Sequence, residues 1–330
     1  MSLRFAIIGC GQIAKRHADQ IIKIGKLVAV CDIQLEKCKS FAANYNTKAY
    51  YSIDDLLKNE KDLSLISICT PNVLHAQQSI LALKAGINVL CEKPLCIDVK
   101  DGGMMIKTSL EADKKLFVVK QNRYNPPIVF LKQLIEEKKL GNILSFQINC
   151  FWNRPDAYYV DWKGKKDLDG GTLFTQFSHF IDLLYWMLGE VAEVKSISKN
   201  FIHANIEIED SGVVLFEMKN SAIGTLNYTV NSFAQNMEGS FTVFGENGTV
   251  KVGGQYLNEL EYCNVKDVEF PILPKGKAAN GYGLYQGSMS NHDKVYENLV
   301  KVLQNPSHDF ATGEEGLKTV EIIEKIYSQQ

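Results

Sequence analysis

A glycine-rich turn directly after an apolar stretch restricts the folds open to this chain more than any other feature. Residues Leu3–Ile8 are apolar apart from Arg4, as expected for a strand buried on both faces of a parallel sheet. The turn Gly9-Cys10-Gly11-Gln12-Ile13-Ala14 follows, and a helix is predicted over residues 13–24. A second strand is predicted over residues 27–31 and ends at Asp32. This order predicts the first βαβ unit of a dinucleotide-binding Rossmann fold.

The residues of this turn each have a physical reason in such a fold. Gly9 permits the tight turn, Gly11 lets the backbone approach a pyrophosphate, and Ala14 keeps the helix close to the strand. The pyrophosphate then lies at the helix N-terminus, where the amide donors and the helix dipole converge. Asp32 follows at about 20 residues, the distance expected for a carboxylate that binds the ribose 2′-hydroxyl. Because an aspartate repels a 2′-phosphate, we expect NAD rather than NADP.

The alternation of strands and helices continues, with strands predicted over residues 63–69, 88–91 and 116–120. In open parallel sheets, ligands bind beyond the carboxyl ends of the strands. The polar residues that follow these strands should therefore share one crevice with the glycine turn. We expect cofactor contacts from Gly9, Gly11, Gln12, Ile13, Asp32, Thr70, Pro71, Asn72, His75, Glu92, Lys93 and Asn122, and from Trp162 and Lys163 further along the chain.

The turn Glu92-Lys93-Pro94 follows the predicted strand 88–91. Proline fixes its own φ and holds Lys93 away from the helical region, so this lysine has less freedom than most surface lysines. Alone, the three residues would fit a solvated turn. At a strand end beside a dinucleotide fingerprint, we expect Lys93 to point into the cofactor cleft.

The remaining sequence has a different character. A chain of 330 residues suits two domains, and we place the NAD-binding Rossmann domain at residues 1–122 and a second domain at residues 123–330. The second has β-rich stretches from Ile143 onward and a hairpin signal at Asn247-Gly248. The expected fold class is α/β: a doubly wound parallel sheet, then an α+β domain with a large open antiparallel sheet for substrate binding and oligomerisation. Its C-terminal helices could pack back on the first domain.

Composition excludes several classes of function. The net charge of −2 and the lack of a Lys/Arg block argue against nucleic acid. No apolar run approaches the ~20 residues that span a bilayer. The eight cysteines form no Cys-x-x-Cys pair, which argues against a zinc ribbon and favours a reducing compartment. Since the N-terminus is not a signal peptide, we expect a cytoplasmic protein.

In the second domain, a helix predicted over residues 173–188 carries a group of polar residues that are candidates for the site. Thr175, His179 and Asp182 recur at spacings of four and three, so they share one face. A histidine there fits either a satisfied core position or a catalytic role. His179 and Asp182 lack a third ligand at a recognisable spacing, so no metal site is expected.

Four motifs in order along the chain resemble the Gfo/Idh/MocA family of NAD(P)-dependent oxidoreductases. They are AIIGCGQIAKRH, CTPNVLH, CEKP and GGTLFTQFSHFIDLL. The resemblance implies a Rossmann domain followed by a domain with a large open antiparallel sheet. It also implies that Lys93 and His179 are the catalytic residues. Structures of this family often have a cis bond before the proline of the Glu-Lys-Pro motif, which makes Lys93-Pro94 a candidate for one.

The chain departs from the family pattern at one position. Many relatives have an aspartate four residues before the catalytic histidine, whereas this chain has Thr175, followed by Gln176. A threonine cannot be a general base at neutral pH. Either His179 acts without that carboxylate, or Thr175 and Gln176 only orient the substrate. Asp182 could hold His179.

The stretch from Asn153 to Gly189 is similar to a narrower group, the WlbA/WbpB type. These dehydrogenases oxidise UDP-N-acetylglucosaminuronate at sugar carbon 3 in bacterial surface polysaccharide assembly. The resemblance implies a sugar or nucleotide-sugar substrate, and tightly bound NAD that 2-oxoglutarate regenerates. The candidates for gripping the substrate are Arg123, Arg154, Tyr158, Tyr159, Thr175, Gln176 and His179, with Lys163 as a further basic residue.

In the expected reaction, His179 removes a proton from a sugar hydroxyl while a hydride leaves the same carbon for NAD, and Lys93 stabilises the developing alkoxide. Three alternatives remain: an NAD-dependent glycosidase, another sugar or inositol dehydrogenase of the family, and a non-catalytic dinucleotide sensor. Apolar residues on the outer face of an open sheet predict self-association, as a homodimer or homotetramer.

Overall fold

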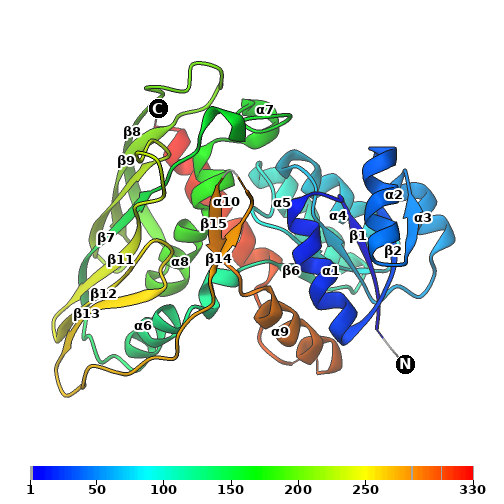
Figure 1. Cartoon of the computed structure of the whole chain (residues 1–330). Helices are drawn as coiled ribbons and strands as arrows, with labels where there is room; N and C mark the ends of the chain where they lie inside the picture. The colour runs from blue at the N-terminus through cyan, green and yellow to red at the C-terminus, as the bar shows by residue number, and fades with distance from the viewer. Residues whose placement is uncertain (1–2, 284, 306, 330) are drawn as a thin grey trace. The chain divides into compact units, whose positions relative to one another are not determined.

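Six parallel strands form the first sheet, in the order β3-β2-β1-β4-β5-β6. The computed structural model describes residues 3–283, 285–305 and 307–329. Its two compact units can be followed in Figure 1: unit 1 comprises Met1–Lys120 and His292–Val320, and unit 2 comprises Gln121–Asn291 and Glu321–Gln330. The first segment of unit 1 thus ends two residues before the boundary expected after residue 122.

The strands of unit 1 are separated by helices, as a parallel sheet requires. The strands are β1 (Leu3–Ile8), β2 (Gly25–Cys31), β3 (Lys48–Tyr50), β4 (Leu65–Ile68), β5 (Asn88–Cys91) and β6 (Leu116–Val118). The helices are α1 (Gln12–Ile24), α2 (Leu35–Asn44), α3 (Ile53–Asn59), the 3₁₀ turn η1 (Asn72–Leu74), α4 (His75–Lys84), α5 (Val99–Glu111), α9 (His292–Gln304) and the first part of α10 (Gly313–Tyr327).

The core of unit 1 explains why its strands read as continuous apolar runs. Residues Phe5 to Ile8 of β1 and all four residues of β4 are buried. Consecutive residues of a strand point to opposite faces, so an unbroken buried run needs cover on both faces of the sheet. The parallel Rossmann sheet predicted from the sequence is therefore confirmed.

Helix α9 belongs to unit 1, although about 170 residues of unit 2 precede it. It packs against α1, and its buried Tyr296 reaches His17 on that helix. This return of the chain adds residues from beyond position 290 to a Rossmann core that is otherwise built from the first 120 residues.

Unit 2 is built on a seven-stranded sheet in the order β13-β12-β11-β7-β10-β9-β8. Its strands are β7 (Ile143–Phe151), β8 (Val191–Lys199), β9 (Ser211–Met218), β10 (Ile223–Thr229), β11 (Glu238–Gly245), β12 (Gly248–Gly253) and β13 (Glu259–Val265), with β14 (Ala279–Gly281) and β15 (Gln286–Met289) as a separate pair. Its helical segments are η2 (Gln121–Tyr124), α6 (Pro126–Glu136), η3 (Asp156–Tyr158), α7 (Lys166–Asp169), the π-helical turn η4 (Leu173–Phe177), α8 (Ser178–Leu188) and the end of α10.

The expected open sheet is confirmed as mostly antiparallel, with one exception. The neighbours β7 and β10 run parallel, which a strand pattern alone does not reveal because the two are far apart in the chain. The predicted hairpin is confirmed between β11 and β12, where Gly245 lies opposite Gly248. Its two turn residues are Glu246 and Asn247, one position earlier than the Asn-Gly tip expected from the sequence.

The sheet of unit 2 has one covered face and one open face. Residues of β9 alternate between buried and exposed, and Figure 1 shows α6 and α8 beside one face of the sheet. Ile197, Val213, Leu215 and Ile223 are exposed apolar residues of β8, β9 and β10. Among the described residues, no helix has both the length and the apolar character needed to cross a bilayer.

Candidate active site

The glycine turn after β1 has the backbone geometry that a dinucleotide requires. Gly9 has a φ of 90°, and a Cβ atom there would lie 2.6 Å from the carbonyl oxygen of Cys69, so a larger residue would both strain and clash. Around Gly11, in contrast, a Cβ would meet nothing within 4 Å. Gln12 and Ile13 begin α1 directly after it. A pyrophosphate can therefore approach the main chain at the N-terminus of α1.

Asp32 connects the turns that follow β1 and β2. Its Oδ2 accepts a hydrogen bond of 2.8 Å from the backbone N–H of Cys10, and its Oδ1 accepts one of 2.8 Å from Gln34. Lys37 Nζ lies 3.7 Å from Oδ2. The carboxylate is thus held beside the glycine turn, in the place expected for a ribose-binding acid.

The residues after β4 and β5 are joined by His75. Its Nδ1 lies 2.7 Å from the carbonyl oxygen of Pro94, and its Nε2 lies 2.9 Å from that of Thr70. Thr70 Oγ1 donates to Gln78 at 2.6 Å, and Asn72 is buried in η1. Burial lowers the pKa of His75, so near pH 7 the neutral ring can donate to one carbonyl at a time.

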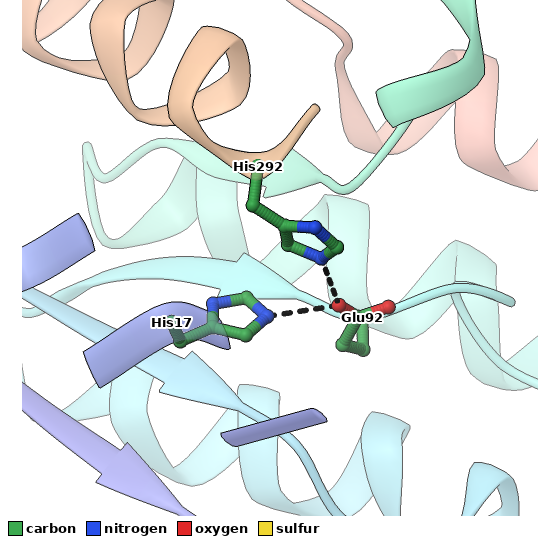
Figure 2. Close-up of side chains that lie close together, drawn as sticks. All are labelled: His17, Glu92 and His292. Atoms are coloured by element: carbon green, nitrogen blue, oxygen red, sulfur yellow. Dashed lines mark hydrogen bonds and ion pairs between the residues drawn. The ribbon is translucent and has the colours of Figure 1, made fainter. Parts of the chain in front are cut away.

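Glu92 lies in the interior of unit 1 between two histidines, as Figure 2 shows. Its Oε1 is 2.8 Å from His17 Nε2 and 3.2 Å from His292 Nε2, and its Oε2 accepts the backbone N–H of Lys93 at 3.0 Å. Burial by itself raises the pKa of Glu92, but the hydrogen bonds from both histidines outweigh it and hold the pKa well below the usual range. Burial lowers the pKa of His17 despite the nearby carboxylate. The group is therefore an ionised carboxylate beside a neutral His17.

The ligand atoms of His17, Glu92 and His292 lie within 4.8 Å of one another, close enough to hold a metal ion. Their N···O separations are hydrogen-bond lengths. We therefore describe them as a hydrogen-bonded triad.

Lys93, the candidate catalytic lysine, directly follows Glu92 in the chain and is half-buried. The peptide bond between Lys93 and Pro94 is cis. The main chain of the Glu-Lys-Pro turn is held at Glu92 by the triad and at Pro94 by His75.

His179, the second candidate catalytic residue, lies in unit 2 at the start of α8. It is buried, and its Nε2 is 3.4 Å from both Gln121 Nε2 and Ser288 Oγ. The π-helical turn η4 directly precedes it. Such turns inside helices occur frequently at functional sites. A helix-breaking irregularity and convergent polar groups are thus found together at His179.

Two other predicted residues near His179 are paired with each other. Arg123 donates to both carboxylate oxygens of Asp182, at 2.9 and 2.7 Å, and its guanidinium stacks 5.0 Å from the ring of Trp186. Arg123 was expected to grip the substrate, and the structure gives it a carboxylate partner within the protein.

Thr175 replaces the aspartate of many relatives, but a carboxylate is close by. The Thr175 hydroxyl donates to the buried carboxylate of Asp169. The other oxygen of Asp169 accepts the backbone N–H of Gly164 at 2.8 Å. The sequence pattern did not single out Asp169, because it lies outside the helix that carries Thr175.

Arg154 lies inside a cage of aromatic rings. Its guanidinium carbon is 5.0 Å from the ring centre of Trp152, 5.4 Å from Tyr158 and 4.9 Å from Tyr285. Its Nε donates to Gln176 at 2.7 Å. We call Trp152, Arg154, Tyr158, Lys163 and Tyr285 the aromatic-basic cluster, since Lys163 Nζ also lies 4.5 Å from the Tyr158 ring. Gln176 donates to the hydroxyl of Tyr158, and the ring of Tyr159 packs on His203.

The remaining predicted cofactor contacts of unit 2 are less closely held. Trp162 is half-buried, and burial lowers the pKa of Lys163, which belongs to the aromatic-basic cluster. The Oδ1 of buried Asn122 has no hydrogen-bond partner within the described chain.

Comparisons with known proteins cover the whole chain. Residues 3–120 match the description "Oxidoreductase family, NAD-binding Rossmann fold", and residues 128–251 match the "GFO/IDH/MocA C-terminal domain". The WlbA dehydrogenase from Chromobacterium violaceum, crystallised with NADH and UDP-GlcNAcA, is 33% identical, with a TM-score of 0.90 over 99% of this chain and 93% of its own. The chain belongs to the Gfo/Idh/MocA family of oxidoreductases.

Two further relatives show the range of the Gfo/Idh/MocA family around this chain. The WlbA dehydrogenase from Bordetella pertussis, also crystallised with NADH and UDP-GlcNAcA, is 32% identical, with a TM-score of 0.89 over 100% of this chain and 96% of its own. Glucose-6-phosphate 3-dehydrogenase of Bacillus subtilis (strain 168) is 24% identical over 344 residues, which cover 99% of this chain and 96% of that protein.

The Gfo/Idh/MocA family membership predicted from the four motifs is confirmed, and NAD is the cofactor of its Rossmann unit. The geometry fits that cofactor: Gly11 leaves open space for phosphate, and Asp32 is held beside the glycine turn. The sequence did not predict the roles of His17 and His292. His17 was visible in the first motif on the buried face of α1, whereas nothing in the sequence links His292 to Glu92, 200 residues away.

Proposed function

We propose that this protein is an NAD-dependent nucleotide-sugar dehydrogenase that oxidises UDP-N-acetylglucosaminuronate at carbon 3 in surface polysaccharide assembly. The observation that supports this best is its full-length similarity, at 32–33% identity, to two dehydrogenases crystallised with NADH and UDP-GlcNAcA. All eight cysteines are free thiols, which suits the reducing cytoplasm proposed as its location.

The proposed chemistry assigns roles to two residues, His179 and Lys93. The His179 imidazole accepts the proton of the sugar hydroxyl as the C–H bond of the same carbon breaks and the carbonyl forms. Imidazoles of ordinary pKa, ~6.5, suit this transfer near neutral pH. The Lys93 ammonium donates to the oxygen as negative charge develops on it. NAD, when bound, takes up the hydride. Proton and hydride are thus both accounted for.

The aromatic-basic cluster fits an anionic substrate. The guanidinium of Arg154 is buried, and its hydrogen bonds go to neutral acceptors: the side chains of Gln176 and Asn236 and the carbonyl of Asn153. A buried cation is costly unless a charge or strong acceptors compensate it. A carboxylate or diphosphate beside the cluster would supply that charge. This property distinguishes UDP-N-acetylglucosaminuronate from neutral sugars.

A substrate panel tests the proposal. The purified protein would be assayed for NADH formation and by mass spectrometry with UDP-N-acetylglucosaminuronate, UDP-N-acetylglucosamine, glucose 6-phosphate and myo-inositol, each with and without 2-oxoglutarate. We expect the uronate alone to lose a pair of hydrogen atoms, with multiple turnovers only when 2-oxoglutarate is present.

The panel also separates the alternatives. Preferred oxidation of glucose 6-phosphate or inositol would assign the chain to another sugar dehydrogenase group. Release of a free sugar without net NADH would indicate glycosidase chemistry. Tight NAD binding without turnover of any sugar would favour a sensor.

A further inference from the structure

The two carboxylate oxygens of Glu92 have different hydrogen-bond partners. Oε1 faces His17 Nε2 and His292 Nε2, whereas Oε2 accepts the backbone N–H of Lys93 at 3.0 Å. Neither oxygen is directed at solvent, because Glu92 is 5% exposed. The negative charge of Glu92 therefore acts inside unit 1, on its histidines and on the main chain of the next residue.

The histidine side of this arrangement continues as an ordered relay. An ionised carboxylate only accepts hydrogen bonds, so neutral His17 must carry its proton on Nε2. Its Nδ1 is then an acceptor, and the Tyr296 hydroxyl at 2.8 Å must donate to it. Ser67 Oγ, 2.9 Å from Tyr296, can donate in turn. Ser67, Tyr296, His17 and Glu92 are all buried, so water does not compete for these bonds.

A second restraint acts on the other side of Lys93. His75 Nδ1 lies 2.7 Å from the carbonyl oxygen of Pro94, and His75 is 1% exposed. Lys93 is therefore held at its own N–H by Glu92, and one residue later by His75 in the tautomer that carries the proton on Nδ1. The three histidines come from α1, α4 and α9, three elements that are well separated in the sequence.

We propose that Glu92, with His17, His292 and His75, forms a positioning scaffold that fixes the main chain at Lys93. The proposal rests on the proposed function of Lys93 in hydride transfer. A lysine has a long flexible stem, so its ammonium can be placed only if its backbone is fixed. A misplacement of about 1 Å at a reacting group can cost ~100-fold in rate.

A double-mutant cycle tests this scaffold. Glu92→Gln keeps the shape of the side chain and an acceptor for the histidines, but it presents an amide N–H to the N–H of Lys93. We expect kcat to fall roughly 10-fold to 100-fold, with the Kd for NAD changed less than about twofold. In a Lys93→Met background, the same change should cost nothing further, because the scaffold acts only through Lys93. His308→Gln, an exposed histidine of unit 1, is the control and should keep full activity.

A milder variant covers the case in which Glu92→Gln does not fold. Tyr296→Phe removes only the hydroxyl that donates to His17, and we expect a kcat roughly threefold lower with an unchanged Kd for NAD. Additive losses in the Lys93→Met background would overturn the proposal, and so would a Glu92→Gln protein that has lost NAD binding.

Two measurements test the scaffold without any assay of turnover. Nitrogen-15 NMR should find His17 protonated at Nε2, and hydrogen exchange should find the Lys93 amide protected in the wild type but not in Glu92→Gln. Stoichiometric Zn²⁺ in the purified protein, with His17 metallated, would overturn the scaffold. A wild type that oxidises no sugar of the panel would contradict the proposed function, while the exchange result still decides whether Glu92 holds Lys93.

Discussion

At the scale of single residues, two buried arginines of unit 2 have opposite surroundings. Arg123 donates two hydrogen bonds to the carboxylate of Asp182, which compensates its charge within the protein. Arg154 donates to Gln176 and to other neutral acceptors, and three aromatic rings surround it. Removing one partner of a buried ion pair leaves a costly charge, so the loss of either Arg123 or Asp182 should destabilise the fold.

Lys93→Met tests the catalytic lysine. Methionine keeps an unbranched side chain but cannot stabilise an alkoxide, so we expect kcat for the sugar oxidation to fall about 100-fold to 1,000-fold. NAD binding should remain, as measured by fluorescence titration. Lys100→Met, at an exposed position of α5, is the matched control. Full hydride transfer by Lys93→Met would refute the assignment.

Asp32→Asn tests the preference for NAD. The amide keeps an oxygen that can accept the Cys10 N–H, but it no longer repels a 2′-phosphate, and Lys37 is close enough to attract one. We expect the ratio of kcat/KM for NAD over NADP to fall at least roughly 10-fold. Steady-state kinetics with both cofactors measures this ratio. An unchanged ratio would mean that Asp32 does not face the ribose.

At the scale of elements, the end of α10 is anchored beside the turn that leads to His179. The hydroxyl of Tyr327 accepts the backbone N–H of Leu173, the first residue of η4, at 3.0 Å and donates to Glu209 at 2.6 Å. Gly171 has a φ of 126°, and a Cβ there would lie 2.2 Å from the Tyr327 hydroxyl. The first residue of η4 is thus hydrogen-bonded to the end of α10, a helix far away in the sequence.

Glu209 gives this anchor a pH dependence. Burial raises the pKa of Glu209 to about 7, against the hydrogen bonds from Tyr327 and Tyr228. The folded carboxyl keeps its proton above the ordinary value of 4.5, so its contribution to stability is complete below that value and is lost as the pH rises through about 7. As the pH rises from about 6 to about 8, we expect the melting temperature of Glu209→Gln to decrease less than that of the wild type. Identical slopes in calorimetry would contradict this.

The stability contributed by His17 and Glu92 should depend on pH in the opposite direction: it decreases as the pH falls. The pKa of His17 is below 6.5 in the folded protein, so the unfolded chain binds more protons as the pH falls below that value. Stability is complete above about 6.5 and decreases toward lower pH. The contribution of Glu92 is lost only below its ordinary value of 4.5. Urea unfolding followed by circular dichroism should show a smaller loss for His17→Gln between about pH 7 and pH 5 than for the wild type.

At the scale of the whole molecule, the open face of the unit 2 sheet presents apolar residues in register. Ile197 on β8 lies directly opposite Val213 on β9, and Leu215 follows two residues later. These side chains are exposed by 72%, 48% and 52%. Leu215 itself lies opposite the exposed Lys195, so charged residues are interspersed on this face. Exposed apolar residues on one face of a sheet are nevertheless a common self-association surface. It supports the homodimer or homotetramer expected from the sequence.

Charges on this patch should disrupt the assembly. We expect light scattering to find the wild type as a dimer or tetramer, and the double variant Val213→Lys, Leu215→Lys as a monomer, because the lysines would have to lose their hydration at the interface. Lys100→Glu on unit 1 is the control for a simple change of charge. A monomeric wild type would reject the prediction.

The parts of the fold that follow local rules were predictable. The glycine turn, Asp32 and the first two buried strands of unit 1, β1 and β2, are encoded within the first 32 residues, where the run of apolar residues and the conformational needs of glycine suffice. The parallel pairing of β7 with β10 could not be predicted, because pairing between distant strands leaves no local signature. Asp169 is only six residues from Thr175, but it was not recognised as the nearby carboxylate because it lies outside the helix that carries Thr175.

The sequence by itself determined the family, the cofactor and the two candidate catalytic residues, Lys93 and His179, since short motifs carry each of them. Only the tertiary structure decided the state of the groups around them. Glu92 faces the interior because both His17 and His292 lie beside it, and His292 reaches it only because α9 returns to unit 1. Burial and hydrogen bonding set the ionisation of Glu92 and His17, and both depend on contacts between residues far apart in the chain.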